Sequence, residues 1–279
     1  MPLSVLPLLL LAAFCHAAWN ALLKESGNPL LLAARAVAWG TMLSFPFVAA
    51  AWLLHGRPGL PAAAWALALI SSAAELVYFI FLSTAYQRGD LSVVYPLARG
   101  TAPVLAVLVG VILLGERLHP YAVVGVLLVL AGIWSVRRPS AAPGVLVPAL
   151  ATGIMIAAYT SLDRLGVRLA APWLYGWVLW LFAAILLAGF TRIRRLARGG
   201  GGPSTRTALL LGALMTAAYF MVLVALSIAP LAVIAPVRES AIVLVTAWGI
   251  WRLRERQGAW LRVGGALAIL VGIGLLAFA

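Results

Sequence analysis

Long apolar segments, separated by short polar connections, follow one another through the whole chain. A helix needs about 20 apolar residues to cross the hydrocarbon core of a bilayer. Hydrophobic residues make up 65% of the chain and charged residues 10%, against about 45–50% and 25% in soluble domains. We therefore predict an all-α polytopic membrane protein with ten transmembrane helices. The predicted spans are residues 3–23, 29–54, 61–86, 91–114, 120–136, 143–162, 171–190, 207–228, 231–251 and 259–278.

Two of these segments share one pattern, in which an arginine lies inside an apolar run and a Glu-Arg pair ends it. They are residues 91–117 and 231–256. The matched pairs, each separated by 139 residues, are Arg99/Arg238, Gly110/Gly249 and Glu116/Glu255. A further match, at a separation of 140, joins residues 17–22 to residues 157–162. Chance matching of small and aliphatic residues is the alternative explanation.

The matches divide the chain into two repeats, residues 1–139 and residues 140–279, with five predicted spans each. Because five is an odd number, the second repeat must enter the membrane upside down relative to the first. Inverted repeats of this kind place a substrate site near the middle of the bilayer and permit alternating access. The repeat therefore predicts a transporter.

The net charge of +13 does not indicate nucleic acid as a partner, because the basic residues lie in the short connections between spans. Connections after the odd-numbered spans carry 13 Lys and Arg residues, and those after the even-numbered spans carry 4. Cytoplasmic loops are the richer in Lys and Arg. We therefore expect both chain termini on the non-cytoplasmic side.

The N-terminal segment reads as a first span. It lacks the basic region of a signal peptide, and Asn20 and Lys24 close it, so we expect no cleavage. Cys15 is the only cysteine of the chain, which excludes an intrachain disulfide and a multi-cysteine metal site.

Arginines inside spans indicate an internal cavity, because an ionisable side chain costs roughly 2.5–3.5 kcal/mol at the helix centre on insertion scales. Arg99 lies about eight residues into its span, or roughly 12 Å of helix rise. Arg238 lies at a similar depth from the opposite side. We expect one cation toward each mouth of a central cavity, where each helps to close its own end. The alternative is a structural arginine that reaches helix-end carbonyls or the interface.

Glu75 is the most isolated acid, near the middle of the third predicted span. Its carboxyl is expected to be either protonated and neutral or paired with an arginine such as Arg35 or Arg99. A proton-coupling role and a static ion pair both remain open. Glu239 has no acidic counterpart in the first repeat, where Gly100 holds its place, which disfavours coupling in both repeats.

Polar and aromatic side chains share faces of several spans. The first span presents a histidine, a tryptophan and an asparagine at helical spacing, and a lone histidine is more often a packed hydrogen-bonding residue than a proton relay. Together these patterns predict a cavity lined by spans 1, 3, 4, 6, 8 and 9. Its expected substrate-binding residues are His16, Trp19, Asn20, Glu75, Tyr78, Phe79, Tyr95, Arg99, Tyr159, Thr160, Tyr219, Arg238 and Glu239, with Arg99 and Arg238 as gating residues.

Motifs of enzymes are missing from the sequence, which contains no glycine-rich nucleotide loop, no HExxH and no acid pair at a catalytic spacing. We expect no enzyme activity, no metal site and no cofactor. The glycines of the fifth and tenth spans predict close helix packing instead. They are Gly125, Gly132, Gly264, Gly265, Gly272 and Gly274.

The ends of the two repeats resemble a known family. Residues 113–133 read LLGERLHPYAVVGVLLVLAGI, and residues 252–276 read RLRERQGAWLRVGGALAILVGIGLL, where Arg254 replaces the glycine before Glu-Arg. Nearly the whole chain is similar to the paired EamA-type domains of the drug/metabolite transporter superfamily. The resemblance implies a ten-helix inverted-repeat transporter in a bacterial inner membrane, similar to YddG-type amino-acid exporters. It assigns a structural role to the turns Glu116-Arg117 and Glu255-Arg256 and fixes no substrate residue.

We therefore expect a carrier that exports small metabolites, with an aromatic or other apolar amino acid as the substrate. Its expected partners are this small molecule and membrane lipid, with the protein itself a monomer or weak dimer. Two alternatives stay open, a flippase for lipids or lipid-linked sugars and a proton-coupled drug efflux carrier.

Overall fold

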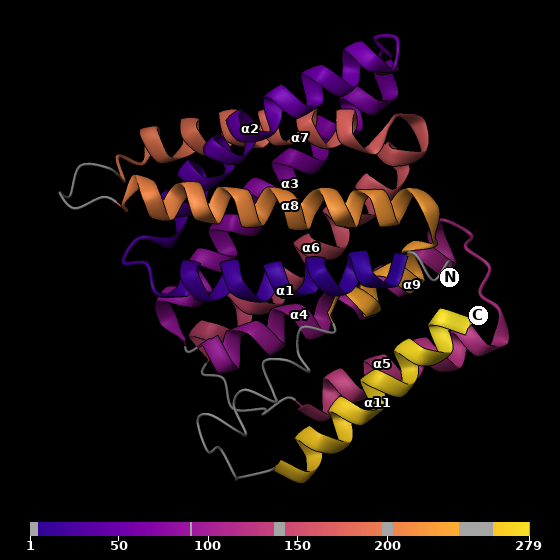
Figure 1. Cartoon of the computed structure of the whole chain (residues 1–279). Coiled ribbons are helices and arrows are strands. Elements are labelled where there is room, and N and C mark those ends of the chain that lie inside the picture. The colour runs from indigo at the N-terminus through magenta and orange to yellow at the C-terminus, as the bar shows by residue number, and fades with distance from the viewer. Residues whose placement is uncertain (1–4, 90, 137–142, 197–202, 240–258, 279) are drawn as a thin grey trace.

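Helices dominate the computed structural model of the chain, which describes residues 5–89, 91–136, 143–196, 203–239 and 259–278 (Figure 1). No strand occurs in these ranges. The helices are α1 (Val5–Lys24), α2 (Pro29–Leu54), α3 (Ala62–Arg88), α4 (Leu91–Leu108), the π-helix η1 (Val109–Leu113), α5 (Pro120–Val136), α6 (Pro143–Leu169), α7 (Pro172–Ile193), α8 (Thr205–Ile228), α9 (Leu231–Arg238) and α11 (Ala259–Phe278). The predicted all-α polytopic class is confirmed.

Six of the described helices, α1, α2, α3, α6, α7 and α8, are long and apolar enough to cross a membrane. Shorter apolar helical stretches cover residues 97–113, 120–135 and 263–276. The predicted span 231–251 is described only as far as Glu239, and residues 240–251 lie outside the described ranges. The predicted spans 29–54 and 120–136 coincide with α2 and α5.

The predicted end of the sixth span at residue 162 is wrong, because α6 continues to Leu169. The sequence reading ended the span before two charged residues, Asp163 and Arg164. Both are buried in the structure, with 1% and 8% of their surface exposed. Their side chains are paired inside the protein, so the helix has no reason to stop at them.

The fourth predicted span does not remain α-helical to residue 114. After Leu108 it widens into η1, where the amide of Leu114 donates to the carbonyl of Val109 (3.0 Å). Gly110 lies against the start of α9, where a Cβ would be 3.2 Å from the Cβ of Ala232. The turn then closes at Gly115, whose φ of +64° lies in the left-handed region that favours glycine.

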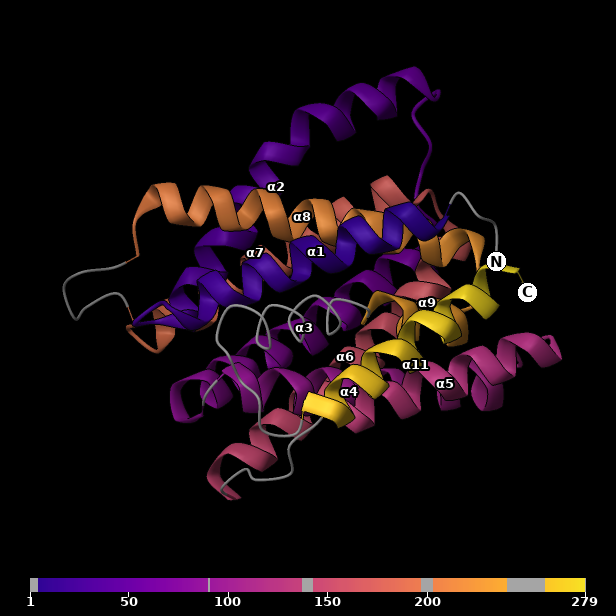
Figure 2. The same ribbon diagram turned by 60° about the horizontal axis from the view of Figure 1, so that its bottom comes forward.

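Two antiparallel helices, α5 and α11, form a pair at one edge of the bundle (Figures 1 and 2). A Cβ at Gly125 would lie 2.9 Å from the carbonyl oxygen of Gly272, and one at Gly132 would lie 2.4 Å from that of Gly265. The predicted close packing is confirmed at these glycines. It is wrong for the remaining two, Gly264 and Gly274, where a Cβ would meet no atom within 4 Å.

The other helices form a compact group in which α3 packs on α6, α2 on α7 and α8, and α1 on α8. In both views α1 begins and α11 ends at the same end of the molecule (Figures 1 and 2). Large apolar side chains such as Phe47 and Leu54 are 78% and 83% exposed. Exposed apolar surface of this extent is expected where a helix faces lipid.

A basic residue near the end of α1 and another in α6 make the same kind of contact. The Lys24 ammonium donates to the carbonyls of Tyr86 and Gly89 at the end of α3. The Arg164 guanidinium donates to the carbonyl of Leu226 near the end of α8. Each cation therefore satisfies C-terminal carbonyls of a neighbouring helix, where positive charge is favourable.

Glu116 ties the turn after η1 to the start of α9. Its carboxylate accepts the amide hydrogens of Leu231 (2.8 Å) and Ala232 (2.9 Å) and pairs with Arg164 Nε (3.1 Å). The first amides of a helix have no partner within the helix, so a carboxylate there stabilises the helix start. The structural role expected for Glu116 agrees with these contacts, whereas Glu255 lies outside the described residues.

Gly212 provides a test of the packing of α8 on α2. A Cβ at this position would lie 2.4 Å from the carbonyl oxygen of Ala36 and 2.9 Å from the amide nitrogen of Gly40. Gly212→Ala should destabilise the protein by about 1–3 kcal/mol, the usual cost of overpacking, measured as a lower Tm in detergent. Gly189→Ala in α7, where no atom lies within 4 Å, is the matched control and should leave Tm unchanged or raise it. Equal Tm values for the two variants would contradict the close approach.

Candidate functional site

All thirteen residues predicted to bind substrate are buried, with 1–7% of their surface exposed. They come from α1, α3, α4, α6, α8 and α9, with Glu239 as the residue that directly follows α9. These are the six helices from which the cavity lining was predicted. The predicted residues therefore face the interior of the bundle, and their role in binding stays a prediction.

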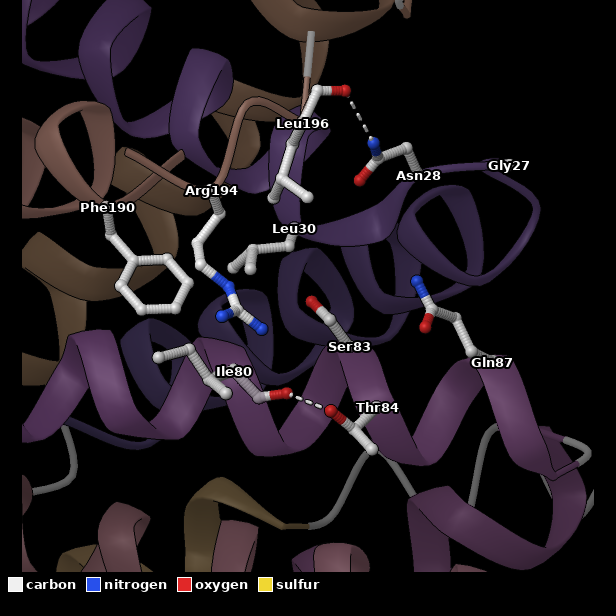
Figure 3. A pocket seen from close by; sticks show the side chains of 10 residues that line it. All are labelled: Gly27, Asn28, Leu30, Ile80, Ser83, Thr84, Gln87, Phe190, Arg194 and Leu196. Carbon is white, nitrogen blue, oxygen red and sulfur yellow. Dashed lines mark hydrogen bonds between the residues drawn. The ribbon is translucent and has the colours of Figure 1, made fainter. Parts of the chain in front are cut away.

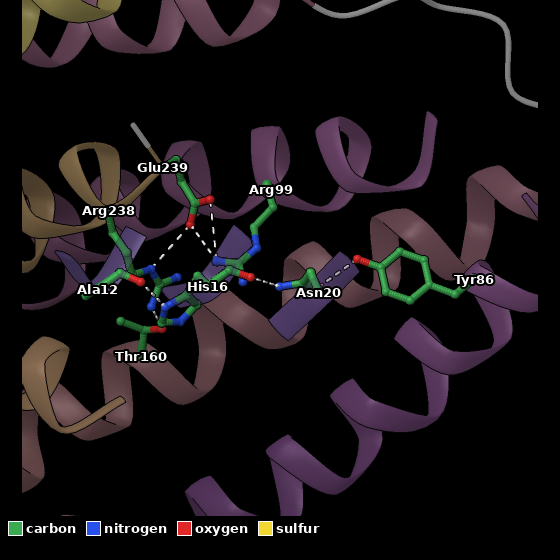
Figure 4. Close-up of polar contacts among 8 residues, drawn as sticks. All are labelled: Ala12, His16, Asn20, Tyr86, Arg99, Thr160, Arg238 and Glu239. Carbon is green, nitrogen blue, oxygen red and sulfur yellow. Dashed lines mark hydrogen bonds and ion pairs between the residues drawn. The ribbon is translucent and has the colours of Figure 1, made fainter. Parts of the chain in front are cut away.

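Arg99, Arg238 and Glu239 form a buried charged triad (Figure 4). Arg99 Nη1 lies 3.1 Å from Glu239 Oε1, and Arg238 Nε lies 3.3 Å from the same oxygen. Arg238 Nη1 also donates to the hydroxyl of Thr160 (3.4 Å). Two guanidinium groups thus share one carboxylate, and the triad has an excess of one positive charge.

The predicted separation of the two arginines toward opposite mouths of a cavity is wrong. Both contact Glu239, because α4 and α9 pack against each other and bring Arg99 and Arg238 to one point. Pairing of Glu75 with Arg35 or Arg99 is also not found. The carboxylate that Arg99 contacts is Glu239, and Arg35 Nη1 donates to the carbonyl of Pro203 (2.6 Å).

Polar residues of α1 form a hydrogen-bonded chain beside the triad (Figure 4). His16 Nδ1 contacts the carbonyl of Ala12 (2.8 Å), and Asn20 Nδ2 donates to the carbonyl of His16 (2.8 Å). The Tyr86 hydroxyl donates to Asn20 Oδ1 (2.7 Å). His16 is thus a packed hydrogen-bonding residue, which is the interpretation that the sequence favoured.

Aromatic rings line the interior from α3 to α8. The centroid of Tyr78 lies 4.8 Å from that of Phe79 and 5.6 Å from that of Tyr159. Tyr159 continues to Tyr219 at 6.4 Å. Arg99 adds a cation–π contact, with its guanidinium carbon 5.5 Å from the ring centroid of Tyr95. These rings offer apolar faces next to the charged triad.

Asp163 is the centre of a second polar cluster, which the predicted site omitted. Its carboxylate accepts hydrogen bonds from the hydroxyls of Ser71 (2.6 Å), Tyr219 (2.6 Å) and Tyr175 (3.1 Å). The predicted span 143–162 ended directly before Asp163. The signal that could have included Asp163 is its position four residues after Tyr159, on the same face of a helix that continues.

Glu75 lies one helical turn after Ser71 and within electrostatic range of Asp163. It is 5% exposed, and no ion pair within the described ranges includes it. Tyr159 lies within electrostatic range of both Arg238 and Asp163. The interior therefore has a positive centre and an acidic centre, with aromatic rings between them.

The positive centre has donors that no group within the described residues uses. Arg99 makes hydrogen bonds only through Nη1 in the described part of the chain, whereas a guanidinium has five N–H donors. The buried Tyr95 hydroxyl has no hydrogen-bond partner there. Such groups suit the carboxylate of a solute. No group of three or more metal-ligating residues was found in the residues that the structure describes.

Comparison with known proteins gives a family and a set of relatives. Residues 3–138 match the EamA-like transporter family. Relatives include the spermidine export proteins MdtI of Salmonella paratyphi B, Salmonella newport and Salmonella heidelberg, each 41% identical over 69 residues. The matched segment covers 25% of this chain and 63% of each relative.

A solved crystal structure of a protein shares the fold along the full length. It covers 100% of this chain and 98% of its own, with a TM-score of 0.73 and 19% sequence identity. At this identity the likeness shows the fold alone.

The charge balance of the triad gives a stability test. Glu239→Gln should destabilise the protein by about 3–5 kcal/mol, because two buried guanidinium groups would lose their counterion. Arg99→Gln should cost less, about 1.5–3 kcal/mol, because the remaining Arg238 and Glu239 still balance. Tm in detergent measures both, and a larger loss for Arg99→Gln would contradict the shared carboxylate.

Proposed function

We propose that the whole chain is a secondary carrier or facilitator that exports a small amphipathic metabolite, because residues 3–138 match the EamA-like transporter family. The proposed substrate is an amino acid with an aromatic or other apolar side chain. The observation that carries this proposal is the buried triad of Arg99, Glu239 and Arg238 beside a layer of aromatic rings. The proposed location is a bacterial inner membrane, with both termini on the non-cytoplasmic side.

The two charged centres match the two ends of a zwitterion. The excess positive charge at Arg99 and Arg238 favours a carboxylate, to which the free Tyr95 hydroxyl adds a donor. The acidic centre at Glu75 and Asp163 favours an ammonium group. Rings between the centres suit an apolar side chain.

A polyamine is the second candidate substrate. Its support is the similarity to spermidine export proteins and the same two carboxyl groups, Glu75 and Asp163, which could each hold an ammonium group. The triad argues against this candidate, because its net positive charge repels a polycation. The transport assay below distinguishes the two substrates.

Inverted repeats, residues 1–139 and 140–279, are the architecture that we propose for the transport cycle. Equivalent contacts support them. Lys24 reaches Tyr86, and Arg164 reaches Leu226; each residue of the second contact follows its counterpart by 140 positions. The two contacts therefore occupy equivalent positions in the two proposed halves.

The helix pair α5 and α11 gives the same support. Its glycine contacts are Gly125 with Gly272 and Gly132 with Gly265. Gly265 follows Gly125 by 140 positions, and Gly272 follows Gly132 by the same number. Each contact therefore joins one glycine to the equivalent of the glycine in the other contact. Antiparallel helices with this relation are expected about an axis in the membrane plane.

The triad joins the proposed halves, because Arg99 belongs to the first repeat and Glu239 to the second. We propose that Arg99 and Arg238 are gating residues that act together through Glu239. A substrate carboxylate would compete with Glu239 for the guanidinium groups and so loosen the contact between α4 and α9. A change of contacts between two packed arrangements is what alternating access requires.

Transport by the purified protein in liposomes tests the substrate class. Counterflow of phenylalanine or leucine should occur, and spermidine should not be moved. Arg99→Ala should reduce the rate at least tenfold while the protein still inserts, since loss of a charge-assisted contact costs about 1.5–3 kcal/mol. Arg168→Ala, on the exposed surface near the end of α6, is the charge-matched control. Unchanged flux by well-inserted Arg99→Ala would rule out the triad as the site, and spermidine counterflow alone would support the second candidate.

Cysteine labelling tests the inverted repeat. In a Cys15→Ser background, which has no other cysteine, Glu25→Cys follows α1 and Arg168→Cys lies near the end of α6. Because α1 and α6 are equivalent in inverted halves, an impermeant thiol reagent should label Arg168→Cys in intact cells and Glu25→Cys only in inverted vesicles. Labelling of both from one side would exclude the inversion.

A further inference from the structure

A cavity of about 260 Å³ lies away from the charged triad, where α2 begins and where α3 and α7 end (Figure 3). Its lining combines polar and apolar side chains and contains no acid. The lining residues are Gly27, Asn28, Leu30, Ile80, Ser83, Thr84, Gln87, Phe190, Arg194 and Leu196. The volume is just below the roughly 300–1,000 Å³ of sites for drug-sized ligands, so it suits a small group.

Arg194 supplies a cation at this cavity that has no counterion among the described residues. The residue directly follows α7, and its guanidinium points into the space beside Ser83 and Ile80 (Figure 3). Within the described ranges it takes part in no ion pair and its side chain makes no hydrogen bond. A guanidinium with free donors recognises carboxylate or phosphate oxygens.

Ser83 gives a second and independent indication of a ligand. It is 3% exposed, yet its hydroxyl has no hydrogen-bond partner in the described part of the protein. Figure 3 shows this hydroxyl directed toward the side of the cavity that holds Arg194. Buried hydroxyls are nearly always paired, so an unpaired one at a cavity indicates a missing partner.

Neighbouring polar groups do not supply that partner. The Thr84 hydroxyl donates to the carbonyl of Ile80 (2.7 Å), and Asn28 contacts the carbonyl of Leu196 (3.4 Å) and the amide of Leu31 (3.1 Å). Both are satisfied by the protein. Arg194, Ser83 and Gln87 are thus the lining groups whose hydrogen-bonding capacity remains for a bound molecule in the described part of the chain, and of these Arg194 carries the charge and Ser83 is buried.

The apolar part of the lining indicates an amphipathic ligand. Phe190, Leu30 and Ile80 surround the guanidinium of Arg194 (Figure 3). The cavity lies at helix ends, and therefore near the level of lipid headgroups in a chain that spans a bilayer. It also lies at the end of the bundle that carries the most basic connection of the sequence, residues 191–207.

We propose that this cavity binds the anionic oxygen group of an amphipathic molecule, with Arg194 and Ser83 as donors and Phe190 against its apolar part. A phosphate or a carboxylate satisfies both donors. Two sources present this chemistry, the headgroup of an anionic phospholipid and a free anion from solution. The site is separate from the substrate site proposed above, and it stands without that proposal.

The test uses the purified full-length protein in detergent and measures Tm during titration with dioleoylphosphatidylglycerol, dioleoylphosphatidylcholine or inorganic phosphate. A ligand that binds the folded state raises Tm. Arg194→Gln should weaken the apparent affinity about tenfold or more, as expected for loss of a charge-assisted contact, and Ser83→Ala should weaken it less. Arg192→Gln is the matched control, because Arg192 is exposed at the same helix end, as Arg194 is, but does not line the cavity.

Stabilisation by phosphatidylglycerol that Arg194→Gln removes and Arg192→Gln retains would support a lipid headgroup. The same pattern with inorganic phosphate would support a soluble anion. Three results would overturn the site: no shift with either anion, equal shifts with phosphatidylcholine and phosphatidylglycerol, or equal losses in Arg192→Gln and Arg194→Gln. None of these readouts depends on transport activity.

Discussion

A charge inside a bilayer needs a partner, and this requirement determines how the halves of the chain meet. Arg99 in α4 and Arg238 in α9 both contact Glu239, which follows α9 directly. Without the carboxylate, each guanidinium would carry a cost of several kcal/mol. With it, Arg99 of α4 contacts Glu239 at the end of α9, although the two residues are 140 positions apart in the chain. This contact holds α4 and α9 together. The excess positive charge of the triad is also the chemical basis for proposing an anionic group on the substrate.

The interior is polar where helices of both halves converge and apolar where they face outward. Asp163 of α6 accepts hydrogen bonds from hydroxyls of α3, α7 and α8, so one carboxylate connects four helices. Tyr159 lies within electrostatic range of this cluster and of the triad. Such an interior provides graded surroundings for a small molecule with a charged end and an apolar end, which a uniformly apolar bundle would not.

The two ends of the bundle are built with different chemistry. At one end Glu116 accepts the first amides of α9 and pairs with Arg164, so the charges of Glu116 and Arg164 balance each other. At the other end Lys24 uses its ammonium on helix-end carbonyls, and Arg194 remains beside a cavity. One end therefore has paired charges, whereas at the other end Arg194 takes part in no ion pair within the described residues.

The sequence by itself determined the class of fold, the limits of α2 and α5, and the burial of all thirteen candidate residues, because apolar length and the cost of buried charge act locally along each helix. Only the tertiary structure decided the partners. Arg99 meets Glu239 and not Glu75, Asp163 belongs to the interior because α6 continues past residue 162, and η1 widens where Gly110 meets Ala232. Each of these depends on which faces of distant helices come into contact, and spacing along a single helix does not contain that information.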